Sequence, residues 1–328
     1  MFLWQKMPNF AQLFTHCTHK NDMINRELIR IKVVQIVYAY YENEGKTLEA
    51  AEKEFLFSLK KAYELYLTQL SLMVGIHHMA TRIVEMQNNR AMRLGEPTVS
   101  QKFIKNTFLL QLQRNKQLRE FINQDDFWAG EEDFLRRTYT KITELDFYRQ
   151  YMSQKDSSYV EDRELCRKIY RTVLCENEEL DDILEEQSLY WNDDKNIVDT
   201  FVLKTIRRFD ETMGGNQPLL PDFKNEQDRE FALTLFRTAI QNEEYFRSLI
   251  AEQTQNWDVE RLARMDLFIL QIALAEVTSF PEIPLNVTIN EYVEIAKFYS
   301  TPRSGSYING LLDTIAKRLL EENKITKQ

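Results

Sequence analysis

Glycine and proline are scarce in this chain, which has 8 glycines and 7 prolines among 328 residues. These residues are the ones that tight turns most often require, and glycines also build the loops that hold phosphates. Leucine and glutamate are the most frequent residues instead, and together with lysine and glutamine they favour helix along nearly the whole chain. The composition therefore predicts an all-α fold.

The net charge and the cysteine content restrict the partners that the protein can bind and the compartment in which it works. The formal net charge is −9, so a nucleic acid would have to bind at a local cationic patch. Three cysteines cannot form a disulfide framework, and their odd number suits a reducing compartment. No apolar run approaches the ~20 residues of a membrane helix, and the first ten residues lack the apolar stretch of a signal peptide. We expect a cytoplasmic protein.

Recognisable catalytic motifs are missing. The sequence lacks the signatures of phosphate-binding loops, dinucleotide-binding folds, zinc proteases and serine hydrolases. His77 and His78 are adjacent, so on a helix they point in different directions and cannot hold one ion well. His16, Cys17 and His19 resemble metal ligands, but no second ligand pair accompanies them, and a flexible extension is the favoured interpretation. We expect no enzyme, no cofactor and no metal site.

Breaks in the helical pattern divide the chain into four expected segments. They are an N-terminal extension (1–22), an N-terminal lobe (23–95), a helical insertion with a Gly/Pro linker (96–225) and a C-terminal lobe (226–328). Within the insertion, we expect helices at 99–123, 130–152, 161–175, 177–190 and 195–212. The acidic run 176–186 is interpreted as a solvated helix face, with a docking surface for a basic partner as the alternative.

The first helix of the N-terminal lobe, expected at 24–42, is apolar nearly all round. Arg26 and Arg30 lie four residues apart on one stripe of it. Either they are arginines of a core helix that reach the surface, or they form a phosphate-binding stripe. The next helical stretch, from Thr47 to about Arg93, is expected as one or two long helices.

The C-terminal lobe ends in two helices with a polar turn between them. Thr288 to Glu291 has the spacing of a capping box, which would begin the first of these helices. Ser300 to Ser306 is the expected turn, with Tyr307 near the start of the last helix and Gly310 inside it, where close helix packing would be possible. Tyr307 is either a half-buried packing residue or a ring held at the surface on which a base stacks. Asp258 is an expected helix cap.

Three blocks of the C-terminal lobe carry a resemblance to a known family: WDVERLARMDLFILQIALAE from Trp257, IPLNVTINEYVEIAK from Ile283 and SYINGLLD from Ser306. Their order and spacing resemble those of the NusB-type transcription antitermination proteins. The first helix is similar to the family's R-x-x-x-R-x-x-x-x-Q-x-x-Y pattern, which starts here at Arg26. The resemblance covers about 24–60 and 226–320. It implies a two-lobed NusB-like helical bundle, enlarged by a helical insertion.

The resemblance also implies a function. Such a protein binds the single-stranded boxA element of nascent ribosomal RNA together with the ribosomal protein NusE, and it joins the RNA polymerase elongation complex. By position, Arg26 and Arg30 would meet phosphates, Tyr307 would stack on a base, and Glu276 would contact the ribosomal protein. Asn290 and Glu291 would fix a helix start. The implied RNA-binding residues are Arg26, Arg30, Tyr38, Lys297, Arg303, Ser304 and Tyr307.

Two departures keep an alternative open. The family's first helix follows an arginine-rich run, whereas Asn25, Glu27 and Leu28 surround Arg26 here. Arg303 stands where the family commonly has an acidic residue. The alternative is a helical protein–protein interaction scaffold of the transcription or ribosome-assembly machinery, with weak or no RNA binding. An accessory domain of an RNA-modifying enzyme is less favoured, because the sequence has no glycine-rich cofactor loop.

Overall fold

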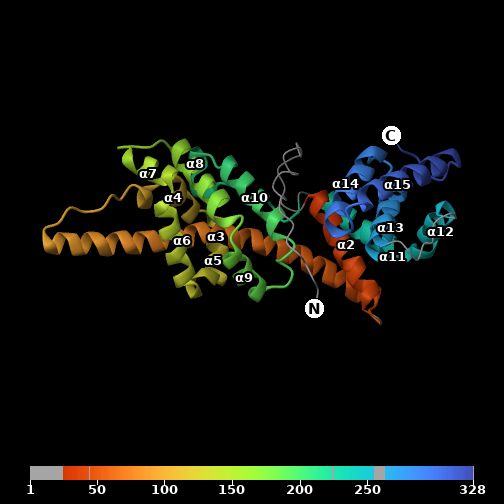
Figure 1. Ribbon diagram of the computed structural model, residues 1–328, viewed down its shortest axis with the longest axis horizontal. Coiled ribbons are helices and arrows are strands. Elements are labelled where there is room, and N and C mark those ends of the chain that lie inside the picture. The colour runs from red at the N-terminus through yellow and green to blue at the C-terminus, as the bar shows by residue number, and fades with distance from the viewer. Residues whose placement is uncertain (1–24, 44, 224, 255–262, 328) are drawn as a thin grey trace. The chain divides into compact units, whose positions relative to one another are not determined.

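The computed structural model describes residues 25–327 apart from 44, 224 and 255–262 (Figure 1). The regular elements of this part of the chain are all helical, as the composition predicts. The chain divides into two compact units, of which one comprises Ile24–Lys60 with Asp222–Gln328. We name it the terminal unit. The other comprises Lys61–Pro221 together with residues outside the described part, and we name it the insert unit.

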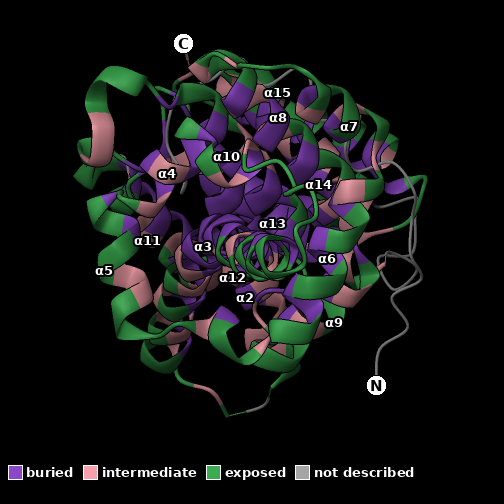
Figure 2. Cartoon of the chain, turned by 90° about the vertical axis from the view of Figure 1, so that its left-hand side faces the viewer, coloured by how far each residue is buried: buried purple, intermediate pink, exposed green. Residues whose placement is uncertain are grey.

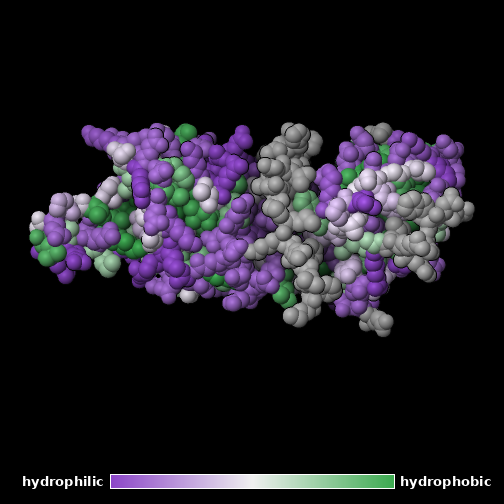
Figure 3. All heavy atoms as spheres, in the orientation of Figure 1, coloured by the Kyte–Doolittle hydropathy of each residue, from purple (hydrophilic) through white to green (hydrophobic). Residues whose placement is uncertain are grey.

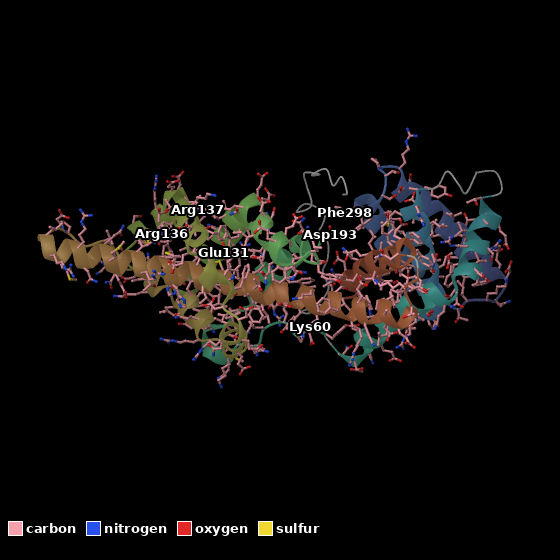
Figure 4. All side chains as sticks on the ribbon, turned by 90° about the horizontal axis from the view of Figure 1, so that it is seen from below. Lys60, Glu131, Arg136, Arg137, Asp193 and Phe298 are labelled. Atoms are coloured by element: carbon pink, nitrogen blue, oxygen red, sulfur yellow. The ribbon has the colours of Figure 1, made fainter. Side chains whose placement is uncertain are left out.

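Helix α3, Leu48–Leu94, contributes to both units (Figure 1). It is one continuous helix, and Gly95 follows it with a φ of +67°, the left-handed conformation that commonly ends helices. The terminal unit contains this helix as far as Lys60, which Figure 4 labels. The expected boundary at residue 95 therefore marks the end of a helix, whereas the boundary between the units lies within the helix.

The insert unit consists of α3 and a series of shorter helices. These are α4 Thr107–Gln113, α5 Lys116–Gln124, α6 Glu132–Glu144, α7 Asp146–Ser153, α8 Tyr159–Ile169, α9 Glu178–Gln187 and α10 Lys195–Arg208, with the short turns η2 Phe103–Lys105, η3 Phe127–Gly130, η4 Tyr170–Leu174 and η5 Glu211–Asn216. The helix expected at 99–123 is split, because the Asn115 side chain accepts a hydrogen bond from the backbone N–H of Leu118 and starts a new helix. The helix expected at 130–152 is likewise divided, at Leu145.

The expected Gly/Pro linker is packed onto the insert unit. Asn115 donates its side-chain amide to the carbonyl of Gln217 at 2.6 Å, and Leu220 donates its backbone N–H to the hydroxyl of Tyr66 at 3.1 Å. A Cβ atom on Gly215 would lie 2.6 Å from the backbone oxygen of Arg114. The glycine is therefore required by a close approach of two backbones, and the segment is part of the core rather than a tether.

The terminal unit is built around α13. Its helices are α2 Arg26–Glu42, the first part of α3, α11 Glu226–Gln241, α12 Glu243–Gln253, α13 Arg264–Ser279, α14 Leu285–Tyr299 and α15 Ser304–Glu321. Residues Phe268 to Val277 are all buried, and α2, α11, α12, α14 and α15 each contact α13. Figure 2 shows buried residues on the inner sides of the helices and exposed residues on their outer sides. An apolar sequence on all sides makes α13 the central helix.

Several details of this unit differ from the expectation. Helix α14 begins at Leu285 after Pro284, so Thr288 and Glu291 lie inside the helix and the predicted capping box is wrong. Proline favours the first residues of a helix because it fixes φ and has no N–H to leave unpaired. Helix α15 begins at Ser304 rather than at Tyr307, and a Cβ on Gly310 would meet nothing within 4 Å, so Gly310 allows no close packing.

Some expectations concern residues outside the described part of the chain. His16, Cys17 and His19 lie in the N-terminal segment, and Asp258 lies within 255–262. Among the described residues, no helix combines the length and the apolar character needed to span a membrane.

Candidate nucleic-acid interface

Two of the contacts between α2 and α13 in the terminal unit involve residues implied by the resemblance. Arg30 of α2 meets Glu276 near the end of α13, and the ring of Tyr38, two turns later in α2, meets that of Phe268 near the start of α13. Helices α2 and α13 are therefore antiparallel. The residues implied by the resemblance fall into two groups, one at each end of α13.

The first group is a buried ion pair. Arg30 donates from Nε and Nη2 to the two carboxylate oxygens of Glu276 at 2.7 and 2.8 Å, and from Nη1 to Glu291 at 3.3 Å. Thr288 and Tyr292 also donate their hydroxyls to Glu276. Burial lowers the pKa of Arg30, but the carboxylates of Glu276 and Glu291 together outweigh this effect and hold it above its ordinary value.

This arrangement gives Arg30 and Glu276 a structural role. Arg30 is 4 % exposed and Glu276 is 0 % exposed, and the two groups use each other's hydrogen-bonding capacity. A phosphate contact by Arg30, or a partner contact by Glu276, needs a side chain that reaches the surface. Glu291, expected to fix a helix start, lies inside α14 and takes part in this pairing. We therefore leave Arg30 and Glu276 out of the interface.

Arg26 is intermediate between a core and a surface residue. Its Nε donates to Asp228 at 3.1 Å, and its guanidinium carbon lies 4.7 Å from the centre of the Phe231 ring. The side chain is 35 % exposed, and the Asp228 side chain is 10 % exposed. The guanidinium is thus held in place by a carboxylate and an aromatic ring, and part of it faces solvent.

The second group gathers at the start of α13. The ring of Tyr38 meets Phe268 edge to face at 5.8 Å between centroids. Two residues earlier in α13, Asp266 accepts the hydroxyl of Ser304 at 2.8 Å. Tyr307, one turn further along α15, is half-buried; burial, and secondly the Asp266 carboxylate, raise the pKa of its hydroxyl. The structure thus brings Tyr38, Ser304 and Tyr307 to one end of the unit.

Two exposed cations flank the start of α15. Arg303 directly precedes the helix, and Lys297 lies in the last turn of α14, next to Phe298, which Figure 4 labels. A Cβ on Gly305 would lie 3.4 Å from Cγ of Lys297, so the lysine stem covers the first turn of α15. Lys297 also pairs with Glu294 at 2.5 Å. This end of the unit therefore combines a half-buried aromatic ring with two exposed positive charges.

The residues that position these groups were not found from the sequence. Asp266 and Phe268 hold the second group, while Asp228 and Phe231 hold Arg26. One sequence signal could have found such contacts: a charged residue inside an otherwise apolar helix, as at Glu276. It indicates that the charge has a buried partner, but it does not identify that partner.

Comparison with known proteins gives consistent matches. The model of the NusB family matches residues 207–317. The transcription antitermination protein NusB of Salinibacter ruber is 34% identical over 132 residues, covering 38% of this chain and 82% of that protein. NusB of Geotalea daltonii is 38% identical over 133 residues, covering 40% of this chain and 89% of that protein. A solved structure of T. maritima NusB is 31% identical and covers 38% of this chain and 87% of that chain, with a TM-score of 0.29.

Each match takes in most of the relative but less than half of this chain. The chain is longer than NusB, as an extra insertion requires. Its fold is all-α, and the described parts of its three C-terminal blocks fall mainly on α13, α14 and α15, which carry the candidate interface. The chain belongs to the NusB family.

Proposed function

We propose that this protein is an RNA-binding transcription antitermination factor that acts on boxA-type single-stranded RNA of nascent ribosomal-RNA transcripts. The observation that carries the proposal is the group at the start of α13, where half-buried Tyr307 follows exposed Arg303 on the first turns of α15 and Lys297 covers Gly305 of the same helix start. Single-stranded RNA is commonly bound by an aromatic ring that stacks on a base and by cations that hold the backbone. Both elements are present on adjacent turns of the chain.

Tyr307 has a geometry that suits stacking. Its hydroxyl oxygen is buried, whereas the residue as a whole remains partly exposed. The far end of the ring thus lies inside the protein, so the conformational freedom of the ring is restricted before RNA arrives. A ring held in this way stacks on a base at a contribution of about 1–3 kcal/mol. In this proposal Tyr38 and Ser304 position the surface, because one packs on Phe268 and the other is buried against Asp266.

The cations contribute a second part of the affinity. Arg303 and Lys297 are exposed at the same helix start, and the exposed part of Arg26 adds a third positive charge to the same unit. Phosphate contacts of this kind add affinity without reading bases, and they weaken as salt rises. Family membership supports the remaining parts of the proposal, which are binding together with the ribosomal protein NusE and loading onto the RNA polymerase elongation complex.

The test is binding of labelled boxA-type RNA to the purified protein in the presence of NusE, followed by fluorescence anisotropy. Tyr307→Ala is expected to weaken binding by about 5- to 150-fold, which corresponds to the loss of one stacked base. Tyr307→Phe keeps the ring and is expected to bind nearly as the wild type. Tyr245→Ala removes an exposed tyrosine from α12 and is the matched control. If the wild type bound boxA RNA and a scrambled RNA with equal affinity, the proposal would be contradicted.

The salt dependence separates the cations from the ring. Arg303→Ala is expected to lower the slope of log affinity against log salt concentration by about 0.7, as expected for one lost contact to single-stranded RNA. Tyr307→Ala should leave the slope unchanged. A wild-type slope near zero would contradict phosphate binding at this surface.

A second candidate function is an interaction scaffold with weak or no RNA binding. The observation that favours it is the engagement of both arginines of α2 in ion pairs, with Asp228 and with Glu276, in a chain of net charge −9. On this alternative, NusE and RNA polymerase are recovered equally well by the wild type and by Tyr307→Ala, and boxA RNA adds nothing to either recovery. A boxA-dependent recovery that Tyr307→Ala abolishes would exclude it.

A further inference from the structure

The end of α3 and the segment after it expose a cluster of apolar side chains. Met86 and Met92 are 61% and 68% exposed, and Leu94 and Val99 are exposed as well. Figure 3 shows hydrophobic residues at the end of the insert unit where α3 projects. Met86 and Leu94 line one shallow depression, and apolar side chains that lie together mark an interaction surface, whereas scattered ones do not. Methionine is common at such surfaces because its flexible thioether adapts to a partner.

This surface is held in a defined conformation. Val99 donates its backbone N–H to the Asn88 side chain at 2.7 Å, and Asn88 donates to the Val99 carbonyl at 3.3 Å. Val84 and Ala91 on the same helix are buried, unlike Met86 and Met92. The helix therefore has a packed side and an open side, and the exposed methionines do not result from fraying of the helix end.

The open side of α3 is cationic. A shallow depression runs along it, lined by Arg82, Glu85, Met86, Asn89, Arg90, Arg93 and Leu94. The lining thus contains three arginines and one glutamate. Of the arginines, Arg82 is already paired with Glu132 at 2.6 Å. Arg90 and Arg93 remain as exposed charges beside Met86 and Leu94. The surface suits a partner that offers carboxylates next to apolar groups.

The same unit carries a surface of opposite charge at α9. A second shallow depression is lined by Lys141, Leu145, Thr172, Val173, Glu176, Asn177, Glu178, Glu179 and Asp182. Asp181, Glu185 and Glu186 are also exposed on α9, and Leu189 just beyond it is 80% exposed. Arg137 of α6, labelled in Figure 4, pairs with Glu179, but carboxylates still predominate.

We propose that the insert unit binds a second copy of this chain, with the open side of α3 in one copy against the α9 surface of the other. The two surfaces have opposite charge; the α3 surface includes exposed Met86 and Leu94, and the α9 surface includes partly exposed Leu145 and Val173. In a two-fold arrangement each surface is used once per copy, so the assembly closes as a dimer. Such a dimer contains the same contact twice, which increases its buried area.

The first test is the mass of the purified full chain in solution. Sedimentation from about 2 to about 200 µM at low salt should show a rise from 39.2 kDa towards twice that mass. About 0.5 M salt should shift the transition to higher concentration by at least about 10-fold, because exposed charges are screened. A chain that stays monomeric over the whole range at low salt overturns the proposal.

Charge reversal identifies the surfaces. Arg90→Glu with Arg93→Glu, and separately Asp182→Lys with Glu186→Lys, should each leave a monomer. An equimolar mixture of the two variants should dimerise again, because one contact of the mixed dimer is native and the other has both charges exchanged. Lys116→Glu with Arg119→Glu, on α5, is the matched control and should dimerise as the wild type does. Circular dichroism checks that each variant keeps its helices.

Other outcomes decide against the proposal. Dimers that both double variants leave intact would place the interface elsewhere. A mixture that fails to dimerise, although each variant is folded, would show that α3 and α9 do not pair. A monomeric wild type whose RNA affinity falls on changing Arg90 and Arg93 would assign the α3 surface to nucleic acid.

Discussion

Arg30 and Glu276 are 246 positions apart in the sequence, and two N–H groups of the arginine donate to the two oxygens of the carboxylate. Both side chains lie inside the terminal unit. Removing two charges from water is costly, so such a pair contributes little net stability compared with apolar residues. Removal of only one partner is strongly destabilising, because the charge of the other stays buried without compensation.

Replacement of Glu276 by alanine is therefore expected to destabilise the terminal unit by about 3–5 kcal/mol. Urea unfolding followed by circular dichroism measures the change. Asp313→Ala is the control, since Asp313 forms an exposed pair with Lys317 and its loss should cost less than about 1 kcal/mol. Changing Arg30 and Glu276 together to methionine should cost less than Glu276→Ala alone. Equal effects of Glu276→Ala and Asp313→Ala would contradict the buried pair.

Two glycines should respond to alanine in opposite directions. Gly215→Ala places a Cβ against the carbonyl of Arg114 and is expected to destabilise the insert unit by about 1–3 kcal/mol. Gly310→Ala fills open space within α15 and is expected to stabilise the terminal unit by about 0.5–1 kcal/mol. Thermal or urea unfolding of both variants provides the comparison. A stabilising Gly215→Ala would show that the Gly/Pro segment is not packed as described.

Ser304 and Ser306 offer a matched pair in the first turn of α15. The Ser304 hydroxyl is buried and contacts Asp266, whereas Ser306 is exposed. Ser304→Ala is expected to cost about 1–2 kcal/mol, because Asp266 loses its donor, and Ser306→Ala less than about 0.5 kcal/mol. If Ser304 positions Tyr307, its variant also weakens RNA binding. Unchanged RNA affinity in a destabilised Ser304→Ala would separate the two roles.

The buried carboxyl of Asp199 predicts a pH dependence in the insert unit. It accepts hydrogen bonds from the Tyr170 hydroxyl at 2.6 Å and from Lys195 at 2.9 Å. Burial raises the pKa of Asp199 to about 6, even though Lys195 opposes the shift. The folded state then binds this proton more tightly than the unfolded state, whose aspartate has a pKa of about 3.9. The stability that the bound proton contributes is full below about pH 4 and is lost as pH rises through about 6.

Comparison with Asp199→Asn isolates this effect from the other carboxyls. Between about pH 4 and pH 7 the wild type should lose about 2 kcal/mol relative to the variant, by the linkage of protons to folding. Urea unfolding at several pH values measures the difference. Asp125→Asn, an exposed change in the same unit, should run parallel to the wild type. Parallel curves for Asp199→Asn as well would contradict the assignment.

The elements that follow local patterns were predicted from the sequence. Helix α2 was expected at 24–42 and spans Arg26–Glu42, and the run expected from Thr47 to about Arg93 is helix α3. Both depend on residues a few positions apart, which periodicity records. Membership of the NusB family followed from three ordered blocks, and the comparisons confirm it. The roles given to Tyr307, Arg303 and Lys297 stay predictions.

The details that were missed depend on contacts between distant residues. Nothing near Arg30 in the sequence indicates that it will pair with Glu276. Likewise, nothing near Gly215 indicates that the carbonyl of Arg114 will approach it closely. The division of the chain at Lys60 was missed for the same reason, because a continuous helix shows no local break where its neighbours change. Asn115 was a local signal that could have been used, since asparagine before an apolar run favours a helix start.

The two contacts between α2 and α13 also fix a length. Arg30 and Tyr38 are eight residues apart on α2, and Phe268 and Glu276 are eight apart on α13, which is about 12 Å along either helix. A slip of one helix by a turn would break both contacts together, so the unit has no intermediate register in which one of them survives. The two ends of α13 are therefore held at a constant distance. An RNA strand that contacted both Tyr307 and Arg26 would have to span this fixed distance.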